Sequence, residues 1–208
     1  MDALFERLHR QLIHQADNQS VYLVAGLGNP GREYRLTRHN IGFMVIDALV
    51  KAWNLSLHKV QSKAIITSGM YNGNKVILAK PQTYMNLSGQ AVSGLLNFYK
   101  IPLDHLIVIH DDIDLPFGTI RIRPGGGSAG QKGIGSIIER LGTQDFARIR
   151  LGVGRPNGQM DSANYVLQSF SKEDEEFLSN FLLSAGEAVG EFILKGLDSA
   201  MNKFNGSL

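Results

Sequence analysis

The chain has 208 residues, of which 43% are hydrophobic, so it can bury one substantial core and a single domain is the default expectation. Its 21 Lys and Arg residues nearly balance its 19 Asp and Glu residues, which argues against a polycation that coats long nucleic acid. The absence of cysteine excludes disulfides, thiolate zinc sites and cysteine nucleophiles, and it suits a reducing compartment.

Residues 1–20 carry apolar side chains at a helical spacing. They lack the continuous apolar core of a signal peptide, and Asp2, Glu6 and Asp17 argue against a transit peptide. No apolar run approaches the roughly 20 residues that cross a bilayer. We therefore expect an amphipathic N-terminal extension (1–20) followed by one domain (21–208), in the cytoplasm and without a membrane partner.

Strand-like and helix-like segments alternate through the predicted domain. In chain order they are strand 21–27, helix 41–53, strands 64–70 and 75–79 joined by an Asn-Gly turn, helix 87–99, strand 106–110, strand 119–123, helix 134–141, strand 147–153 and helix 172–194. This order predicts an α/β fold: a single domain with a mixed, mostly parallel, twisted sheet and helices on both faces.

Four polar residues stand beside predicted strand or helix boundaries, and they are Asn29, His39, Asn86 and Asp111. Ligands of open α/β sheets gather outside the carboxyl ends of the strands, and this topology allows the four to meet there. One imidazole, one carboxylate and two carboxamides are what a water-activating esterase needs: a base, a group that orients it, and donors for an oxyanion. The histidine and the two asparagines also have ordinary interpretations: His39 as a helix-start residue, and Asn29 and Asn86 as turn or cap residues.

Two other functions fit parts of the pattern. The spacing of Gly26, Gly28 and Gly31 matches a dinucleotide fingerprint, but Pro30 removes an amide from the loop and the suitably spaced Asp47 lies in a predicted helix. Separately, the carboxylates at 111, 112 and 114 could bind a divalent cation, but they lack an EF-hand frame. We therefore expect no cofactor and no metal.

Residues 119–155 form a locally basic segment, with seven basic residues against two acidic ones and a net charge of +5. Arg121 and Arg123 alternate on a predicted strand and so share one face. Two guanidinium groups beside the glycines at 125–127 would suit a phosphate. The alternative is a solvated strand face beside a flexible loop.

Together these residues resemble bacterial peptidyl-tRNA hydrolases, from about residue 21 to the C-terminal helix. The most specific tracts occur in the family's order and are 26–31, 37–40, 80–89, 110–116 and 148–156. The resemblance implies a monomer that needs no cofactor and hydrolyses the ester between a peptide and the 3′ end of tRNA, releasing tRNA for translation.

Carried over residue by residue, the resemblance implies that His39 is the catalytic base and that Asp111 keeps it basic and oriented. Asn29 and Asn86 would hold the peptide and carbonyl groups of the substrate. The positions that match contacts of the family to the tRNA end are Tyr34 and Tyr84. Arg121 and Arg123 match the basic residues with which the family clamps the tRNA 5′-phosphate, and Arg150 matches a further phosphate contact.

One stretch departs from the family pattern. Gln131 and Lys132 stand where the family usually has histidine and then asparagine, and that asparagine normally helps to hold peptidyl-tRNA. Lys132 cannot accept a hydrogen bond and adds a positive charge, so it either binds a phosphate or weakens the positioning of the substrate. This departure leaves a second hypothesis, an RNA-binding protein that kept the fold and lost hydrolysis, although the base, the acid and both asparagines argue against it.

Overall fold

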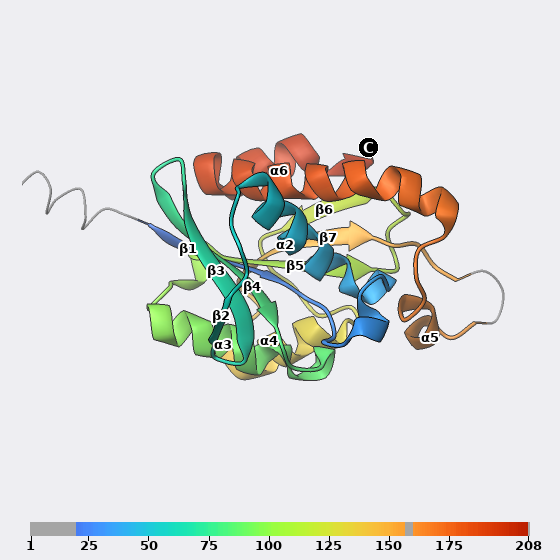
Figure 1. Cartoon of the computed structure of the whole chain (residues 1–208), viewed down its shortest axis with the longest axis horizontal. Helices are drawn as coiled ribbons and strands as arrows, with labels where there is room; N and C mark the ends of the chain where they lie inside the picture. The colour runs from blue at the N-terminus through green and yellow to red at the C-terminus, as the bar shows by residue number, and fades with distance from the viewer. Residues whose placement is uncertain (1–19, 157–159, 208) are drawn as a thin grey trace, which may run out of the picture.

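The computed structural model describes residues 20–156 and 160–207, so the predicted N-terminal extension lies outside the described residues except for Ser20. The described chain forms one eight-stranded sheet, in the order β2-β3-β4-β1-β5-β7-β6-β8, with helices on both faces (Figure 1). The strands are β1 (Val21–Gly26), β2 (Lys59–Gln61), β3 (Ala64–Tyr71), β4 (Asn74–Pro81), β5 (Leu106–Asp112), β6 (Thr119–Arg123), β7 (Ala147–Gly152) and β8 (Gly206–Ser207).

The sheet is mixed, as predicted, and its parallel part is the centre. β4, β1, β5 and β7 run parallel to one another, whereas the pairings of β2 with β3, β3 with β4, and β6 with β7 and β8 are antiparallel. Every residue of β5 is buried, which fits its continuous apolar sequence and its position between two parallel neighbours. β2 and β8 were not predicted.

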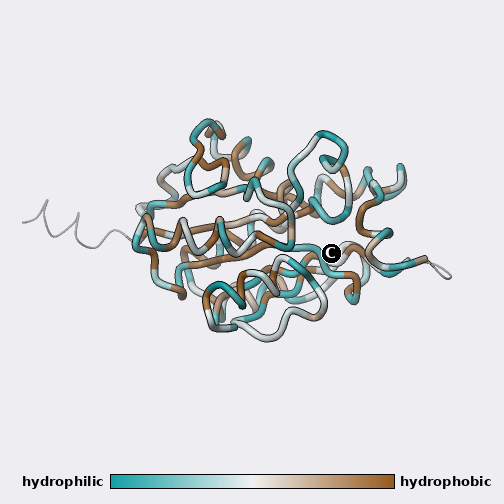
Figure 2. The backbone as a smooth tube through the Cα atoms, turned by 90° about the horizontal axis from the view of Figure 1, so that it is seen from below, coloured by the Kyte–Doolittle hydropathy of each residue, from teal (hydrophilic) through white to brown (hydrophobic). Residues whose placement is uncertain are grey.

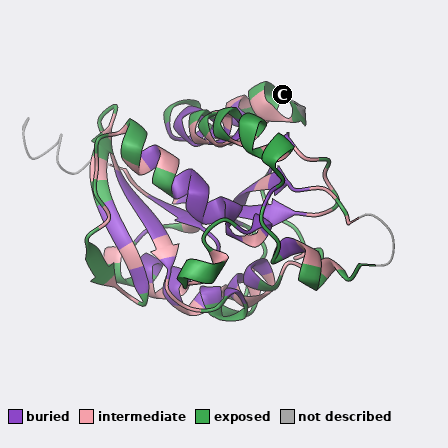
Figure 3. Ribbon diagram, turned by 45° about the vertical axis from the view of Figure 1, so that its right-hand side comes forward, coloured by how far each residue is buried: buried purple, intermediate pink, exposed green. Residues whose placement is uncertain are grey.

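The helices cover the two faces of the sheet in pairs. α2 (Ile41–Ala52) and α6 (Lys172–Phe204) lie on one face, and α3 (Ser88–Tyr99) and α4 (Lys132–Leu141) lie on the other (Figure 1). Hydrophobic residues recur between hydrophilic ones along these helices (Figure 2), and the buried residues concentrate where helices meet the sheet (Figure 3). A short helix that was not predicted, α5 (Ser162–Val166), precedes α6.

The long helix α6 continues past its predicted end at residue 194 through a kink at Gly196, whose φ is 83°. It has the length and hydropathy of a membrane-crossing helix, and no other helix in the described part of the chain does. Its buried side chains, including Phe181, Ala185 and Val189, belong to the core above the sheet. A core helix of this length meets the same criterion, and this packing accounts for the apolar character of α6.

A close approach between α2 and the sheet positions the start of this helix. A Cβ atom added to Gly42 would lie 2.5 Å from both the Ile109 carbonyl oxygen and the Leu27 amide nitrogen. Only glycine leaves room for this contact. It brings the residues just before α2, His39 among them, against the carboxyl end of β5.

We expect Gly42→Ala to destabilise the protein by at least about 1–3 kcal/mol, because the added methyl group meets backbone atoms that cannot move independently. Gly135→Ala is the matched control, because its Cβ would lie no closer than 3.8 Å to another residue and alanine favours the helix by roughly 0.5–1 kcal/mol. Urea unfolding measures both. A Gly42→Ala protein as stable as wild type would contradict the close contact.

Candidate active site

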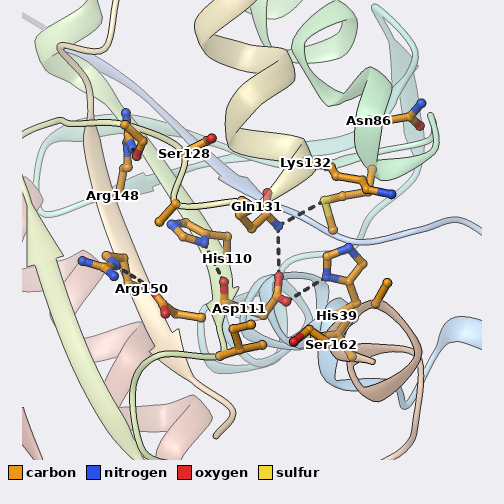
Figure 4. A pocket seen from close by; sticks show the side chains of 18 of the residues that line it. His39, Asn86, His110, Asp111, Ser128, Gln131, Lys132, Arg148, Arg150 and Ser162 are labelled. Atoms are coloured by element: carbon orange, nitrogen blue, oxygen red, sulfur yellow. Dashed lines mark hydrogen bonds and ion pairs between the residues drawn. The ribbon is translucent and has the colours of Figure 1, made fainter. Parts of the chain in front are cut away.

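A cleft of about 950 Å³ opens at the carboxyl ends of the central strands, and its size suits a small-molecule group or the end of a polymer (Figure 4). Eight of the ten residues predicted for the site line it: Asn29, His39, Tyr84, Asn86, Asp111, Arg123, Lys132 and Arg150. The other two, Tyr34 and Arg121, are not among its lining residues.

The imidazole of His39 and the carboxylate of Asp111 are in direct contact. His39 lies in a 3-10 helix (Arg38–Asn40) just before α2, and its Nδ1 is 2.8 Å from Oδ2 of Asp111 near the end of β5. The Asp111 side chain is only 3% exposed, so hydrogen bonds from the protein must take the place of water around its carboxylate. With Nδ1 donating to this carboxylate, Nε2 is the nitrogen that can accept a proton in the cleft.

The backbone and side chain of Asn29 are both held in place. Its amide donates to Oδ1 of Asn40 and its carbonyl accepts from Nδ2 of Asn40, each at 2.9 Å. Its side-chain Oδ1 accepts the Met85 amide at 2.8 Å, which leaves Nδ2 as the group available to a ligand. Asn40 was not predicted as a site residue, although its position beside His39 was a signal.

Asn86 is exposed in a 3-10 helix (Met85–Leu87) at the cleft. Its alternative interpretation as the N-cap of the next helix is wrong, because Leu87 occupies the N-cap position of α3 and no side chain caps that helix. The carboxamide of Asn86 has no hydrogen-bond partner within residues 20–156 and 160–207 and can serve a ligand.

Four arginines lie on one face of the sheet. Arg121 pairs in register with Arg150, and Arg123 pairs with Arg148, so all four side chains leave β6 and β7 on the same side. Arg150 forms an ion pair with Asp112, and Arg148 donates to the carbonyls of Gly127 and Gln144. Among the described residues, Arg121 and Arg123 have no such partner. Like charges opposite each other destabilise a sheet, so this face favours a bound anion.

Arg148 is a site residue that the sequence did not reveal. It is 3% exposed and lies over the ring of Phe146 at 4.5 Å while holding Gly127 of the glycine-rich loop. Burial and the nearby charge of Arg150 lower the pKa of Arg148 to about 10, so it stays protonated at neutral pH. Arg148 therefore fixes the loop that forms one wall of the cleft.

The opposite wall comes from the segment around α5. Asp161, Ser162 and Leu167 line the cleft there. Arg38 ties this segment to the histidine, because it donates to the Ser169 carbonyl and stacks over the ring of Tyr165 at 4.5 Å. Arg38, the residue before His39, thus holds the α5 segment beside the cleft.

In the part of the chain that the structure describes, the geometry matches neither the divalent-cation site nor the dinucleotide site considered above. No group of three His, Cys, Asp or Glu side chains there could hold a metal ion. The three carboxylates considered above are engaged separately, Asp111 by His39, Asp112 by Arg150 and Asp114 by Arg155. The glycine-rich turn at 26–31 leads into 3-10 helices rather than the α-helix start that a dinucleotide fingerprint requires.

Comparison with known proteins gives a consistent result. The family model described as peptidyl-tRNA hydrolase matches residues 23–208. The peptidyl-tRNA hydrolase of Thermoanaerobacter sp. (strain X514) is 47% identical over 186 residues, which is 89% of this chain and 100% of the relative. That of Bacillus cytotoxicus is 48% identical over 183 residues, 88% of this chain and 98% of the relative. A crystal structure of peptidyl-tRNA hydrolase from Acinetobacter baumannii aligns with a TM-score of 0.84 and 32% identity, covering 91% of this chain and 97% of that one.

His110 generates a prediction about stability. Its Nδ1 lies 2.7 Å from the Asp111 carbonyl oxygen, and its Nε2 is buried without a partner among the described residues. Burial lowers the pKa of His110 below its ordinary value of 6.5, against the opposing effect of Asp111. The folded protein keeps this imidazole neutral, whereas the unfolded chain takes up a proton below pH 6.5.

We therefore expect the free energy of unfolding to decrease as the pH is lowered below 6.5, with His110 contributing up to about 1.4 kcal/mol per pH unit. His110→Asn keeps a donor for the Asp111 carbonyl and cannot titrate, so its unfolding free energy should fall less steeply between pH 6.5 and about 5. Urea unfolding over this pH series measures the two slopes. Equal slopes would show that His110 does not remain neutral in the fold.

Proposed function

The chain belongs to the peptidyl-tRNA hydrolase family, and from that premise we propose that His39 activates the water molecule that cleaves peptidyl-tRNA. The family acts on peptidyl-tRNA, so tRNA is a substrate partner. The observation that carries the proposed mechanism is the contact of His39 Nδ1 with the buried Asp111 carboxylate, inside a cleft with an arginine-rich wall.

In the proposed reaction, Nε2 of His39 takes a proton from water as the water attacks the ester carbonyl. Asp111 holds the required tautomer and stabilises the imidazolium that forms. The ester bond to the tRNA 3′ oxygen then breaks, and the proton returns to that oxygen, which leaves a free peptide and free tRNA. Within the described residues, neither Ser128 nor Ser162 hydrogen-bonds to His39, which supports water rather than a serine as the nucleophile.

Carboxamide donors would stabilise the negative charge that develops on the ester carbonyl oxygen. The side-chain amide of Asn29 is held by the Met85 backbone so that its NH₂ group remains for this purpose. Asn86 lines the same cleft and is unpaired among the described residues. Donors that need no rearrangement stabilise a developing oxyanion most effectively.

The acceptor end of tRNA would enter along the basic face. Arg123 would contact the 5′-phosphate beside the glycines of the loop, Arg150 would make a further phosphate contact, and Lys132 would add a cation from the start of α4. Tyr84 is 60% exposed at the cleft and offers a ring on which a terminal base could stack. Tyr34 and Arg121 lie outside the cleft lining, so we assign them to tRNA contacts farther from the ester.

We further propose that the chain acts as a monomer in the cytoplasm. The substrate arises where ribosomes abort translation, and hydrolysis there returns tRNA to use. A monomeric state is the expectation that follows from the family resemblance.

We expect His39→Ala to reduce turnover of an N-acyl-aminoacyl-tRNA by two to four orders of magnitude, about the range for loss of a general base. The measurement is steady-state hydrolysis with purified protein, and circular dichroism confirms folding. Unchanged turnover would remove His39 from the mechanism. A wild-type protein that binds this substrate without cleaving it would instead favour the non-catalytic RNA-binding alternative.

We expect Arg123→Ala to raise KM and to flatten its dependence on salt, because one phosphate contact accounts for a slope of about 0.7–0.9 in a log–log plot. Lys51→Ala is the control, since this exposed lysine lies at the far end of α2 from His39. KM measured across a salt series distinguishes them. A wild-type salt slope in Arg123→Ala would count against the phosphate contact.

A further inference from the structure

The second oxygen of the Asp111 carboxylate also has a partner. Nε2 of Gln131 donates to Asp111 Oδ1 at 2.9 Å, while His39 occupies Oδ2 at 2.8 Å (Figure 4). Gln131 is one of the two residues that depart from the family pattern. In this chain it therefore lies in direct contact with the acid that orients the proposed base.

The same side chain caps α4. Oε1 of Gln131 accepts the Ile134 amide at 2.8 Å, and Gln131 is the N-cap residue of this helix. The two contacts determine the orientation of the carboxamide, because the amide of Ile134 requires an oxygen and the carboxylate requires a donor. Nε2 also lies 3.4 Å from the sulfur of Met85. The helix end thus holds the NH₂ group of Gln131 against Asp111.

We infer that Gln131 is a positioning residue for hydrolysis: it orients the Asp111 carboxylate towards His39 by donating to Oδ1 from the rigid start of α4. This inference rests on the proposed roles of His39 and Asp111. Because Asp111 is buried, loss of this donor would leave a charged oxygen unsatisfied and free the carboxylate to rotate away from the imidazole. Gln131 does not touch the reacting atoms.

The groups around Gln131 explain why a neutral donor suits this position. Asp111 and His110 face it from β5, His39 from the 3-10 helix before α2, and Lys132 from α4 (Figure 4). The nearby Asp112 carboxylate is already paired with Arg150. An uncharged carboxamide donates to Asp111 at every pH, so this hydrogen bond does not itself depend on pH.

Gln131→Glu separates the two functions of the side chain. A carboxylate can still accept the Ile134 amide and cap α4, but when ionised it cannot donate to Asp111 and repels it. We expect kcat near pH 8 to fall about 10- to 100-fold, the loss of one hydrogen bond to a charged group, with KM within about twofold of wild type.

The pH profile gives a signature that a structural defect would not produce. When two carboxylates share a site, one of them holds its proton to higher pH, and the protonated group can donate to the other. The ratio of variant to wild-type kcat should therefore rise as pH falls from about 8 to 6. Taking this ratio removes the pH effects on the substrate and the assay, which both proteins share.

Gln131→Met is the matched control of similar size. It has no donor and no titratable group, so its kcat should be low while its ratio to wild type stays flat with pH. It also loses the helix cap of α4, and Ser171→Ala, which removes the cap of α6 and leaves Gln131 intact, gives the scale of the effect of cap loss on the melting temperature.

These outcomes distinguish the inference from the function on which it rests. If His39→Ala is inactive but Gln131→Glu has wild-type kcat, or raises KM alone, or shows a flat pH ratio, Gln131 does not position Asp111. If His39→Ala retains activity, the proposed mechanism fails first. Combining Gln131→Glu with Asp111→Asn should give strongly non-additive losses, and additive losses would also overturn the inference.

Discussion

The arrangement of this site depends on one buried carboxylate. Asp111 is 3% exposed, and each of its oxygens has a side-chain partner, His39 on one and Gln131 on the other. A carboxylate removed from water is costly unless hydrogen bonds replace its hydration. Because these partners come from the segment before α2 and from the N-cap of α4, satisfying Asp111 also fixes where elements from opposite faces of the sheet begin.

The surrounding contacts reinforce that constraint rather than adding separate sites. Asn40, next to His39, forms two hydrogen bonds with the backbone of Asn29, and the side chain of Asn29 accepts a hydrogen bond from the amide of Met85. Met85 in turn contacts the carboxamide of Gln131. His39, Asp111 and Asn29 are therefore linked through hydrogen bonds from five separate chain segments, which keeps their geometry independent of any single loop.

The sequence predicted the regular elements well because apolar periodicity marks buried faces, and it missed elements too short to show a period. β2 has three residues, β8 has two and α5 has five. The helix α6 extends beyond its predicted end because Gly196 interrupts the helical pattern. Polar residues at strand and helix boundaries predicted that His39 and Asp111 could meet, and the fold brings them into contact. The role of Gln131 could not be predicted, because it depends on a contact between residues 20 positions apart that only the fold brings together.

The near-neutral charge of the whole chain conceals a separation of charge within the cleft. Asp112, adjacent to Asp111, forms an ion pair with Arg150, so Asp111 is the carboxylate left facing His39. Arg150 is therefore already paired before any phosphate arrives, and a phosphate would have to share or displace that pairing. Arg123 is exposed and has no partner among the described residues, so it can meet a phosphate without breaking an existing contact. On this argument we expect Arg123 to provide most of the attraction for the tRNA end, and Arg150 to contribute less because it is already paired with Asp112.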